Sequence, residues 1–471
     1  MNTNGQASLL LSTFNNQKLA FQSEPFLPYS VRIHFLKSLK KSLLAHQAEL
    51  VSALNQDYSG RSEYDTMIGD TLPTVSQINY TISKLKKWMK PENRSAGLML
   101  APAKVKVHYQ PKGVVGIIVP WNFPIMLSLG PLATAIAAGN RVMLKLSEFT
   151  PNTNAVIRKV IETTFSQNHI AVIEGEADVA AEFSALPFDH LLFTGSTQVG
   201  RHVMRAAADN LTPITLELGG KSPVIIAPDM KIETAVERLI YGKCLNAGQI
   251  CVAPDYILCP SHRIEEFVQT YQQRFQVMYQ NLENNQDYTS IINERQFERL
   301  MNLLDDAREK GAHIVSASNT DIDKQQRKFA TQLVTGVTDN MQIMQQEIFG
   351  PILPIVGYDS LDESLDYINQ RPRPLALYIM SFDADIQNHI INHTHSGGIS
   401  INDTVMQVAV DDAPFGGIGP SGMGHYHGKE GFKTFSHAKT VLKKGWFDMG
   451  KFIHPPYGTK LQKFLLGSFL K

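Results

Sequence analysis

Apolar residues recur at intervals of three and four positions between Leu27 and Asp57, through the stretch YSVRIHFLKSLKKSLLAHQAELVSALNQD. This period places the apolar side chains on one face, so the segment predicts one long amphipathic helix. A second helical pattern ends near Lys90. In the VKVHYQ that follows, apolar and polar residues alternate, which predicts a strand with one exposed face at the edge of a sheet.

From Gly113 the pattern changes to short, continuous apolar runs that alternate with helical segments. The runs are VVGIIVP, RVMLKLS, IAVIEG and HLLFTGS. Strands that are apolar throughout and alternate with helices indicate a parallel sheet covered on both faces. The region therefore resembles a doubly wound dinucleotide-binding architecture. Thr150 followed by Pro151 predicts a helix start in which the threonine side chain is the cap.

A second α/β series begins at SPVIIAP and continues through DYILC, PILPIVGYD, PLALYIMSFD and GGISIND. This series predicts a second α/β domain, with Cys251 near its start. The final region, from PFGGIGPSGMGHYHGKEGF onward, is rich in glycine and then mixed.

Composition and charge narrow the kind of protein. The 471 residues contain 44 Lys and Arg against 44 Asp and Glu, so no net field favours nucleic acid or an anionic membrane. The three cysteines, Cys244, Cys251 and Cys259, are an odd number in one short region, which favours a reducing compartment over a disulfide framework. The amino terminus lacks the basic start of a secretion signal, and no apolar run reaches about 18 residues. We expect a cytoplasmic protein with no integral membrane segment, whose partners are small molecules or further copies of the chain.

Cys251, at the end of LNAGQIC, is the most informative of the cysteines. Free cysteines are often buried packing residues, and that interpretation is strong for one cysteine taken alone. A metal site is disfavoured, because no CxxC pair, HExxH motif or matched histidine cluster accompanies it. We interpret Cys244 and Cys259 as packing residues.

Three further stretches carry candidate chemistry, each with a plain structural alternative. Glu217 lies in the apolar stretch LELGGKSP. It is either a general base with raised proton affinity or one half of a buried salt bridge. Gly195 and Gly200 lie in FTGSTQVG, where a turn feeds a helix amino terminus that can receive phosphate, although Thr197 breaks the GxGxxG pattern. Asn122 in VPWNFP can stabilise an oxyanion or can be an ordinary turn residue.

The order of these segments resembles the aldehyde dehydrogenase superfamily. The motifs that carry the resemblance occur in the family's order, and the match runs from about Leu27 to beyond His437. They are PWNFP, KLSEFTP, FTGSTQVG, LELGGKSP, NAGQIC, EIFGP and PFGGIGPSGMGHYHGKEGF. NAGQICVAPDY, SGMGHYHGKEGF, FSH and HPPY are similar to the class 3-like branch, and within it to the bacterial coniferyl aldehyde dehydrogenases.

The resemblance implies a role for each candidate residue. Cys251 is the expected nucleophile, whose thiolate attacks the aldehyde carbon to give a thiohemiacetal and then a thioester. Asn122 and the Cys251 backbone N–H are expected to hold the oxyanion, and Glu217 to activate the hydrolytic water. No metal is implied.

The resemblance also implies an NAD site. Glu148 repels a ribose 2′-phosphate and favours NAD, while NADP remains compatible with this branch. Leu146 departs from the proline that many relatives carry in this motif. The expected cofactor-binding residues are Lys145, Glu148, Gly195, Ser196, Gly200, Glu347, Phe349 and Trp121.

The resemblance implies three parts in an α/β fold. Residues 1–90 and 112–220 are expected to form a Rossmann-like dinucleotide-binding domain, and residues 221–412 an α/β catalytic domain. Residues 91–111 and 413–471 are expected to form a small β oligomerisation arm and a tail, joining a homodimer.

The expected reaction is NAD(P)-dependent oxidation of an aldehyde to a carboxylic acid. The substrate expected from the resemblance is an aromatic aldehyde such as coniferyl aldehyde, or a medium-chain aliphatic one. The alternatives are a fatty or broad-specificity class 3 enzyme, a coenzyme A-acylating dehydrogenase, a thiol hydrolase and an inactive binding protein.

Overall fold

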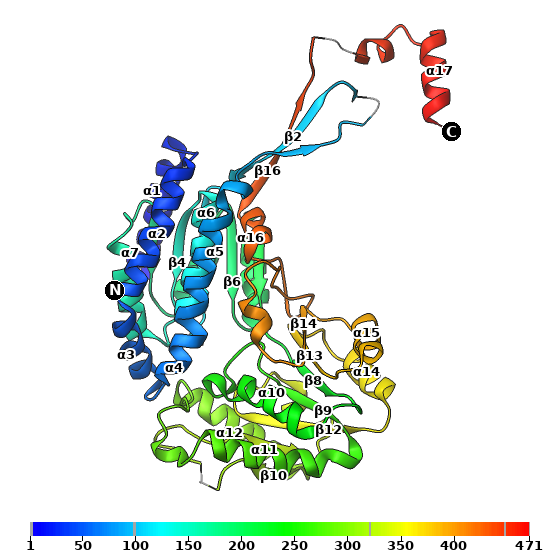
Figure 1. Cartoon of the computed structure of the whole chain (residues 1–471). Coiled ribbons are helices and arrows are strands. Elements are labelled where there is room, and N and C mark those ends of the chain that lie inside the picture. The colour runs from blue at the N-terminus through cyan, green and yellow to red at the C-terminus, as the bar shows by residue number, and fades with distance from the viewer. Residues whose placement is uncertain (1–2, 98–99, 320–321, 447–448, 471) are drawn as a thin grey trace.

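The strands form three sheets, which divide the molecule into two lobes and a projecting arm (Figure 1). The computed structural model describes residues 3–97, 100–319, 322–446 and 449–470. Within these ranges the sheets contain six, seven and three strands. No helix in these ranges is both long and apolar enough to cross a bilayer.

The first lobe is built on the six-stranded sheet, whose strands run in the order β15-β7-β6-β3-β4-β5. Five of the strands are parallel, and the short β15 pairs antiparallel with β7. The chain starts at the central β3 and fills first one side and then the other, which confirms the doubly wound expectation. The strands are β3 (Val114–Ile118), β4 (Arg141–Lys145), β5 (Ile170–Ile173), β6 (His190–Thr194), β7 (Ile214–Glu217) and β15 (Gly422–Met423).

Helices cover both faces of this sheet, as continuous apolar strands require. They are α1 (Thr3–Ser23), α2 (Tyr29–Ala45), α3 (Gln47–Tyr58), α4 (Glu63–Thr66), η1 (Met67–Thr71), α5 (Leu72–Trp88), α6 (Pro124–Ala138), α7 (Pro151–Glu162), α8 (Ala177–Ser184), α9 (Thr197–Ala208) and α16 (Gly428–Thr434).

The expectation of one helix from Leu27 to Asp57 is wrong. The backbone at His46 has φ −106° and ψ 12°, which ends α2 and begins α3. The bend lets α2 pack on α5 and α6 while α3 packs on α7. Periodicity alone does not reveal such a break, because each half keeps the same apolar spacing.

The start of α7 is where the sequence predicts it, but Thr150 is not its side-chain cap. Pro151 is in the first turn, and no side-chain hydrogen bond from Thr150 caps the helix. Instead the carboxylate of Asp57, at the end of α3, accepts from the backbone N–H of Asn152 at 3.0 Å and of Thr153 at 2.9 Å. A carboxylate also complements the positive end of the helix dipole, so it replaces the threonine hydroxyl.

The second lobe contains the seven-stranded sheet, in the order β10-β11-β12-β9-β8-β13-β14. All neighbouring pairs are parallel except β10 with β11. The second α/β series of the sequence is therefore confirmed. Its strands are β8 (Pro223–Ile226), β9 (Tyr256–Pro260), β10 (His313–Ser316), β11 (Gln332–Thr335), β12 (Ile352–Tyr358), β13 (Ala376–Met380) and β14 (Gly398–Ile401). Its helices and short turns are α10 (Ile232–Cys244), η3 (Leu245–Gly248), η4 (Ser261–Arg263), α11 (Ile264–Met278), η5 (Leu282–Asn284), α12 (Glu294–Glu309), α13 (Gln342–Gln345), α14 (Leu361–Asn369), α15 (Ala384–His393) and η6 (Met406–Ala409).

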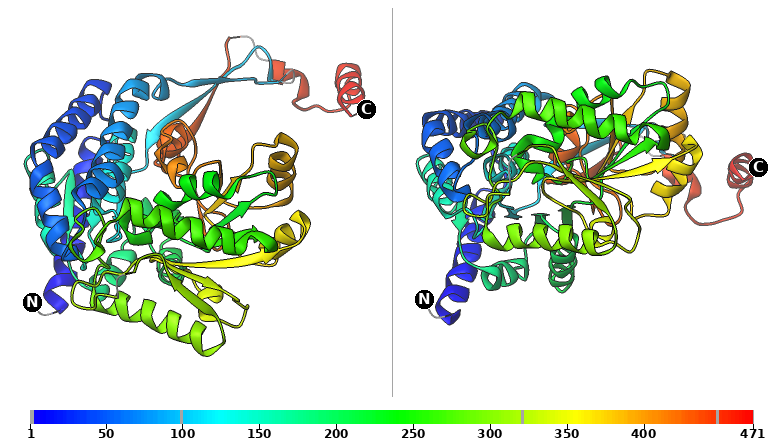
Figure 2. Two further views of the ribbon diagram at one scale, coloured as in Figure 1. Left: turned by 60° about the horizontal axis from the view of Figure 1, so that its bottom comes forward. Right: turned by 90° about the horizontal axis from the view of Figure 1, so that it is seen from below.

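The arm is the three-stranded sheet of β1 (Glu92–Arg94), β2 (Lys104–Pro111) and β16 (Ser436–Lys443). The expected edge position of the VKVHYQ strand is wrong, because β2 lies between β1 and β16. Figures 1 and 2 show the arm leaving the first lobe, with η7 (Met449–Ile453) and α17 (Lys460–Phe469) at its far end. Of the carboxyl-terminal range, β15 pairs with the first sheet and α16 packs on α5 and α6, so only the part from Ser436 onward pairs with β2.

Candidate active site

The predicted site residues of the first lobe lie at one edge of the six-stranded sheet. Lys145 and Glu217 are the last residues of β4 and β7, while Asn122 and Gly195 follow β3 and β6. These strands are parallel, so their carboxyl ends meet at a single edge. This edge is where open α/β sheets bind ligands. Cys251 comes from the second lobe, between α10 and β9.

A left-handed turn delivers Cys251. Asn246, Ala247 and Gly248 have φ values of 50°, 52° and 73°. Asn and Gly tolerate this region, but for Ala it costs roughly 1–2 kcal/mol. Strain of this kind persists only where surrounding contacts over-determine the backbone.

Buried hydrogen bonds of Gln249 and Asn246 supply those contacts. The Gln249 amide nitrogen donates to the carbonyl of Ser290 at 3.1 Å, and its amide oxygen accepts from the backbone N–H of Ile292 at 3.0 Å. The Asn246 backbone N–H donates to the Asp65 carboxylate at 3.0 Å. The turn before Cys251 is thereby tied to elements of both lobes.

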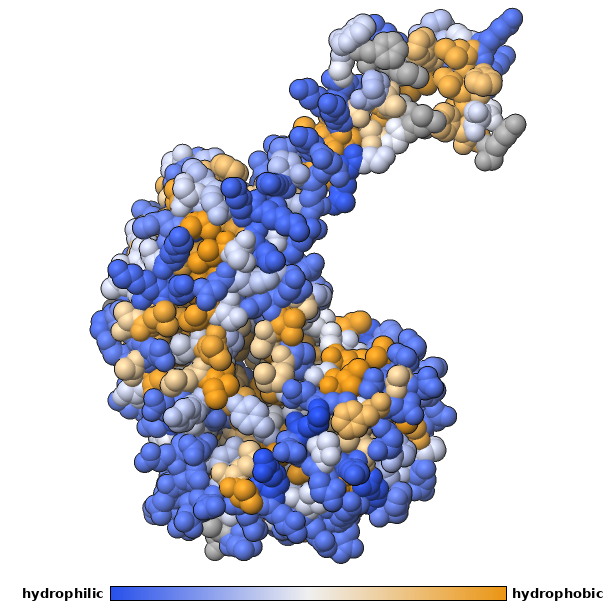
Figure 3. Space-filling view, viewed as in Figure 1, coloured by the Kyte–Doolittle hydropathy of each residue, from blue (hydrophilic) through white to orange (hydrophobic). Residues whose placement is uncertain are grey.

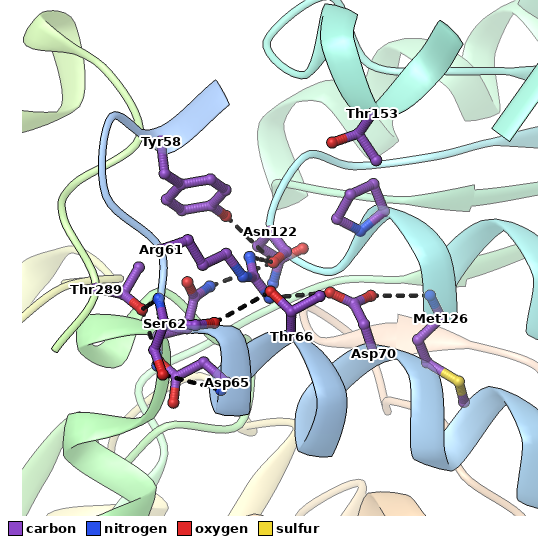
Figure 4. A network of polar contacts seen from close by, with 12 residues as sticks. Tyr58, Arg61, Ser62, Asp65, Thr66, Asp70, Asn122, Met126, Thr153 and Thr289 are labelled. Atoms are coloured by element: carbon purple, nitrogen blue, oxygen red, sulfur yellow. Dashed lines mark hydrogen bonds and ion pairs between the residues drawn. The ribbon is translucent and has the colours of Figure 1, made fainter. Parts of the chain in front are cut away.

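Asn122 is held next to this turn. Its side-chain nitrogen donates to the carbonyl of Gln249 at 3.2 Å, two residues before Cys251. Its own backbone carbonyl accepts from Arg61 at 2.7 Å, Tyr58 at 3.2 Å and Asn246 at 3.3 Å (Figure 4). A side-chain amide carries two hydrogens, so a second one remains to donate to a reacting oxygen.

An ion pair with no exposed side-chain surface anchors the Asn122 loop. The Arg61 guanidinium lies 2.9 Å from the Asp70 carboxylate, with both side chains at 0% exposure. The other Asp70 oxygen accepts from the Met126 backbone N–H at 2.9 Å, at the start of α6 (Figure 4). Burial raises the pKa of Asp70 to about 6, and Arg61 opposes this rise. The sequence gives no signal for this pair, which lies in a helical region where charges usually face solvent.

The three cysteines differ in exposure and surroundings. Cys244 and Cys259 are 1% and 0% exposed and belong to the core of the second lobe, which confirms their interpretation as packing residues. Cys251 is partly exposed. Desolvation raises the pKa of its thiol to about 12, and the carboxyls of Glu347 and Glu217 raise it further. The backbone N–H groups of Cys251 and Val252 act in the opposite direction and favour the thiolate.

Glu217 makes no salt bridge with any residue that the structure describes, so that alternative is wrong. The residue is 3% exposed, and neither carboxyl oxygen has a hydrogen-bond partner within the described ranges. Burial raises its pKa well above the ordinary value. A carboxyl group with raised proton affinity suits general-base chemistry near neutral pH.

The candidates for the nicotinamide side are Glu347, Phe349 and Trp121. Glu347 is partly buried, its Oε1 is inaccessible and unpartnered in the described structure, and desolvation followed by the charge of Asp255 raises its pKa to about 8. A Cβ at Gly219 would lie 2.2 Å from each Glu347 carboxyl oxygen, so a side chain there would displace this carboxyl group. The rings of Trp121 and Phe349 meet edge to face at a centroid distance of 5.3 Å.

The adenine-side candidates lie at the ends of β4 and β6. The Lys145 amine is 2% exposed, donates to the Leu146 carbonyl at 2.8 Å and lies 3.9 Å from the Glu148 carboxylate. Ser196 is the N-cap of α9 and accepts from the backbone N–H of Val199. Gly200 lies within α9, where a Cβ would come within 2.8 Å of a Leu218 methyl carbon. Gly200 therefore allows α9 to pack closely against Leu218.

These residues fit a dinucleotide. The helix start at Ser196 offers backbone N–H groups and a positive dipole to a pyrophosphate. Glu148 offers a carboxylate and Glu347 a carboxyl group to ribose hydroxyls, and Glu347 Oε1 is an unpartnered inaccessible acceptor in the described structure. No group of three or more His, Cys, Asp and Glu side chains in the described part of the chain is placed to hold a metal ion.

The chain belongs to the aldehyde dehydrogenase family. The model of the "Aldehyde dehydrogenase family" matches residues 6–441. The match confirms the resemblance found in the sequence.

Individual relatives agree with this assignment. The chain is 51% identical over 462 residues to a "Probable coniferyl aldehyde dehydrogenase" of Pseudomonas aeruginosa, covering 98% of this chain and 96% of that protein. It is 39% identical over 427 residues to mouse "Aldehyde dehydrogenase family 3 member A2", covering 90% and 87%.

Solved structures confirm the expected fold class. The substrate-bound AldH of Staphylococcus aureus has a TM-score of 0.92 and 39% identity, covering 100% of both chains. An aldehyde dehydrogenase of Mycobacterium tuberculosis complexed with NAD+ has a TM-score of 0.84 and 27% identity, covering 94% of this chain and 92% of that one.

Proposed function

We propose that the protein oxidises an aldehyde to a carboxylic acid, with NAD or NADP as the hydride acceptor. One observation carries the proposal. The partly exposed Cys251 lies near Asn122 and the carboxyl groups of Glu217 and Glu347, at the carboxyl-terminal edge of a sheet of the nucleotide-binding type. The NAD+ complex of the related mycobacterial enzyme supports the choice of cofactor.

In the first step the Cys251 sulfur attacks the aldehyde carbon. The thiol proton is lost to solvent before attack; burial opposes this loss by raising the pKa of the thiol, while the backbone N–H groups of Cys251 and Val252 favour the thiolate. The aldehyde oxygen gains negative charge and accepts from the second Asn122 amide hydrogen and the Cys251 N–H. When bound, the oxidised nicotinamide would accept the hydride from the carbon attached to Cys251.

In the second step Glu217 accepts a proton from water as the water oxygen attacks the thioester carbon. The carbon–sulfur bond breaks, the electron pair stays on Cys251, and the carboxylic acid leaves. Because burial raises the pKa of Glu217 well above its ordinary value, its carboxylate is a stronger base than an exposed one.

The cofactor residues are proposed to divide into two groups. Lys145 and Glu148 bind the adenine ribose, and Gly195 with Ser196 bind the pyrophosphate, while Gly200 lets α9 pack closely behind them. On the reacting side, Glu347 binds the nicotinamide ribose, and Phe349 with Trp121 line the ring site.

The test is the absorbance of reduced cofactor after addition of aldehyde and NAD. The wild type is expected to form reduced cofactor and carboxylic acid without coenzyme A. Cys251→Ala is expected to form no reduced cofactor, while Glu217→Gln keeps one burst of it and turns over slowly. A strict requirement for coenzyme A would overturn the proposal in favour of acyl transfer to coenzyme A. The presence of Glu217 argues against that route, because acyl transfer does not require a base that activates water.

The proposed substrate class is aromatic aldehydes of the coniferyl aldehyde type. The support is the 51% identical Pseudomonas relative, whose name specifies that aldehyde. The catalytic efficiencies with coniferyl aldehyde, benzaldehyde and medium-chain aliphatic aldehydes decide this point. A higher efficiency for the aliphatic series would replace the aromatic assignment with a class 3 fatty or broad-specificity one.

We further propose the domain roles and a cytoplasmic homodimer. The first lobe binds the dinucleotide, the second lobe supplies the nucleophile, and the arm joins two copies. The far end of the arm exposes apolar side chains that a partner copy can cover, with Phe464 at 70% and Leu466 at 53% exposure (Figure 3). The free state of Cys244, Cys251 and Cys259 supports a reducing compartment. Light scattering on the full chain and on a chain ending before Ser436 tests the dimer, which the shorter chain is expected to lose.

A further inference from the structure

Cys251 and Val252 are the two central residues of a tight turn. The Ala253 backbone N–H donates to the carbonyl of Ile250 at 3.0 Å, which closes the turn around them. The chain after Cys251 has an anchor of its own, because the Val252 carbonyl accepts a hydrogen bond from the Tyr378 hydroxyl. The nucleophile is therefore followed directly by a residue whose backbone is tied to another part of the second lobe.

Tyr378 stands on a rigid part of that lobe. It lies in β13, which is hydrogen-bonded to β8 on one side and to β14 on the other. Tyr378 is paired in register with Val224 of β8 and with Ser400 of β14, and its side chain is 0% exposed. A side chain on a strand with neighbours on both sides is held more precisely than one on a loop. The Tyr378 hydroxyl is thus a fixed point to which the turn is attached.

The chemistry of its partners sets the direction of each bond to the Tyr378 hydroxyl. The oxygen accepts from the Val405 backbone N–H at 3.2 Å and from the Gln407 side-chain nitrogen at 3.0 Å. Because both nitrogens are donors, the hydroxyl hydrogen is left to donate to the Val252 carbonyl. Burial raises the pKa of Tyr378 above its ordinary value, so the hydroxyl keeps this hydrogen.

The segment that donates to Tyr378 is itself closely held. Val405 has a φ of 59°, a left-handed conformation that is unfavourable for a β-branched residue and persists only where surrounding contacts impose it. The neighbouring Thr404 hydroxyl donates to the Arg238 carbonyl of α10 at 3.3 Å. A Cβ at Gly242, also in α10, would lie 2.3 Å from that hydroxyl oxygen. The donors are thus packed against the helix that leads into the nucleophile turn.

We propose that Tyr378 is a positioning residue, whose hydroxyl fixes the backbone after Cys251 and thereby aims the Cys251 sulfur at the aldehyde carbon. It acts through Val252 rather than on the substrate, and Gln407 supports it by holding the hydroxyl. Without this bond the Val252 backbone is free to rotate and the sulfur leaves its line of attack. Misplacement of a reacting atom by about 1 Å costs on the order of 100-fold in rate. The inference rests on the proposed function and deepens its first step.

The first measurement is the burst of reduced cofactor in Tyr378→Phe, followed by rapid mixing with NAD and the best aldehyde substrate. The burst reports attack by the sulfur and hydride transfer. Its maximal rate is expected to fall roughly 10- to 100-fold, the scale of a misplaced nucleophile. The concentrations of aldehyde and NAD that give half the maximal burst rate are expected to stay within about twofold of the wild type, because binding is not altered.

The second measurement is the alkylation of Cys251 by iodoacetamide, without aldehyde or NAD. The sulfur forms a bond to the reagent's carbon, iodide leaves, and the thiol proton passes to solvent. This small reagent requires thiolate and access but no single direction of approach, so the rate in Tyr378→Phe is expected to stay within about threefold of the wild type. Mass spectrometry of the peptides follows each cysteine. Cys244 and Cys259 are expected to remain unmodified in a folded variant, because they are 1% and 0% exposed.

Two further variants complete the test. Gln407→Leu keeps Tyr378 and its bond to Val252 but removes one donor, so we expect a smaller fall in the burst rate, roughly threefold. Tyr271→Phe is the matched control, because Tyr271 is 0% exposed, lies in the same core and donates from its hydroxyl to Thr331 at 3.2 Å. This control is expected to keep the wild-type burst.

The outcomes distinguish this inference from the proposed function. A wild-type burst rate in Tyr378→Phe, an equal fall in Tyr271→Phe, or an alkylation rate of Cys251 that falls as far as the burst would each overturn the role of Tyr378. If Tyr378→Phe does not fold, a wild-type burst rate in Gln407→Leu overturns it instead. If the wild type forms no reduced cofactor from any aldehyde, the proposed function fails and this inference falls with it.

Discussion

Removing the ion pair of Arg61 with Asp70 tests most strongly how the first lobe supports the site. We consider Arg61→Met, which keeps the apolar stem of the side chain and removes its charge. Four contacts are lost: the 2.9 Å ion pair, the 2.7 Å hydrogen bond to the Asn122 carbonyl, and the positions of the guanidinium over the Tyr58 ring at 4.8 Å and the Phe123 ring at 5.0 Å. The substitution leaves the Asp70 carboxylate buried without its cation.

Breaking a fully buried pair by removing one partner costs about 3–5 kcal/mol, because the remaining charge stays desolvated. One kcal/mol shifts the unfolding temperature of a domain of 150–250 residues by about 2–4 °C, so we expect a shift of roughly 6–20 °C in the unfolding of the first lobe. The pKa of Asp70 is raised to about 6 even with Arg61 present, and it rises further without that cation. An acid whose pKa is raised on folding destabilises the fold as pH rises through that value. The deficit of Arg61→Met is therefore expected to grow between pH 6 and 8.

Differential scanning calorimetry at pH 6 and pH 8 measures these shifts. The double variant Arg61→Met with Asp70→Asn removes the stranded carboxylate and is expected to recover part of the lost stability. Lys159→Met is the matched control, since its ion pair with Glu49 is 2.8 Å long but has both side chains about half exposed, at 53% and 49%. Equal shifts for Arg61→Met and Lys159→Met, or a double variant less stable than Arg61→Met alone, would refute this reasoning.

Three other substitutions and conditions test the site itself. Gly219→Ala places a Cβ 2.2 Å from each Glu347 carboxyl oxygen, so we expect the KM for NAD to rise more than the KM for aldehyde in steady-state kinetics. Gly248→Ala forces an alanine to φ +73° and places its Cβ 2.6 Å from the Gly350 carbonyl oxygen, which strains the turn by at least roughly 1–2 kcal/mol. We expect kcat to fall severalfold because the strained turn moves Cys251. An unchanged kcat would contradict the role of the turn. Burial raises the pKa of Glu217, so the rate of thioester hydrolysis in the wild type is expected to increase as pH rises through the pKa of Glu217. In Glu217→Gln the rate is expected to be independent of pH over the same range.

Much of the fold was predictable because its elements have strong local signals. The apolar runs ending at Ile118, Lys145 and Thr194 are strands β3, β4 and β6, and their alternation with helices determines a parallel sheet. The errors occurred where a distant contact decides the local structure. Asp57 from α3 takes the capping role expected of Thr150, and β16, which is far along the chain, converts the supposed edge strand into a central one.

The site was predictable only in part, for a similar reason. Asn246 and Gln249 stand within the NAGQIC motif itself, but their buried amide contacts with Asp65 and Ser290 are visible only in three dimensions. No periodicity marks such residues, because each satisfies a single long-range contact.

The covalent intermediate on Cys251 is the central claim, and mass spectrometry of Glu217→Gln tests it most directly. The variant is mixed with the aldehyde and NAD, quenched in acid and digested. We predict that the peptide containing Cys251 gains the mass of the aldehyde less two hydrogen atoms, as a thioester requires, and that no such gain appears without NAD. An unmodified Cys251 peptide after a burst of reduced cofactor, or the same adduct on Cys244 or Cys259, would contradict the account.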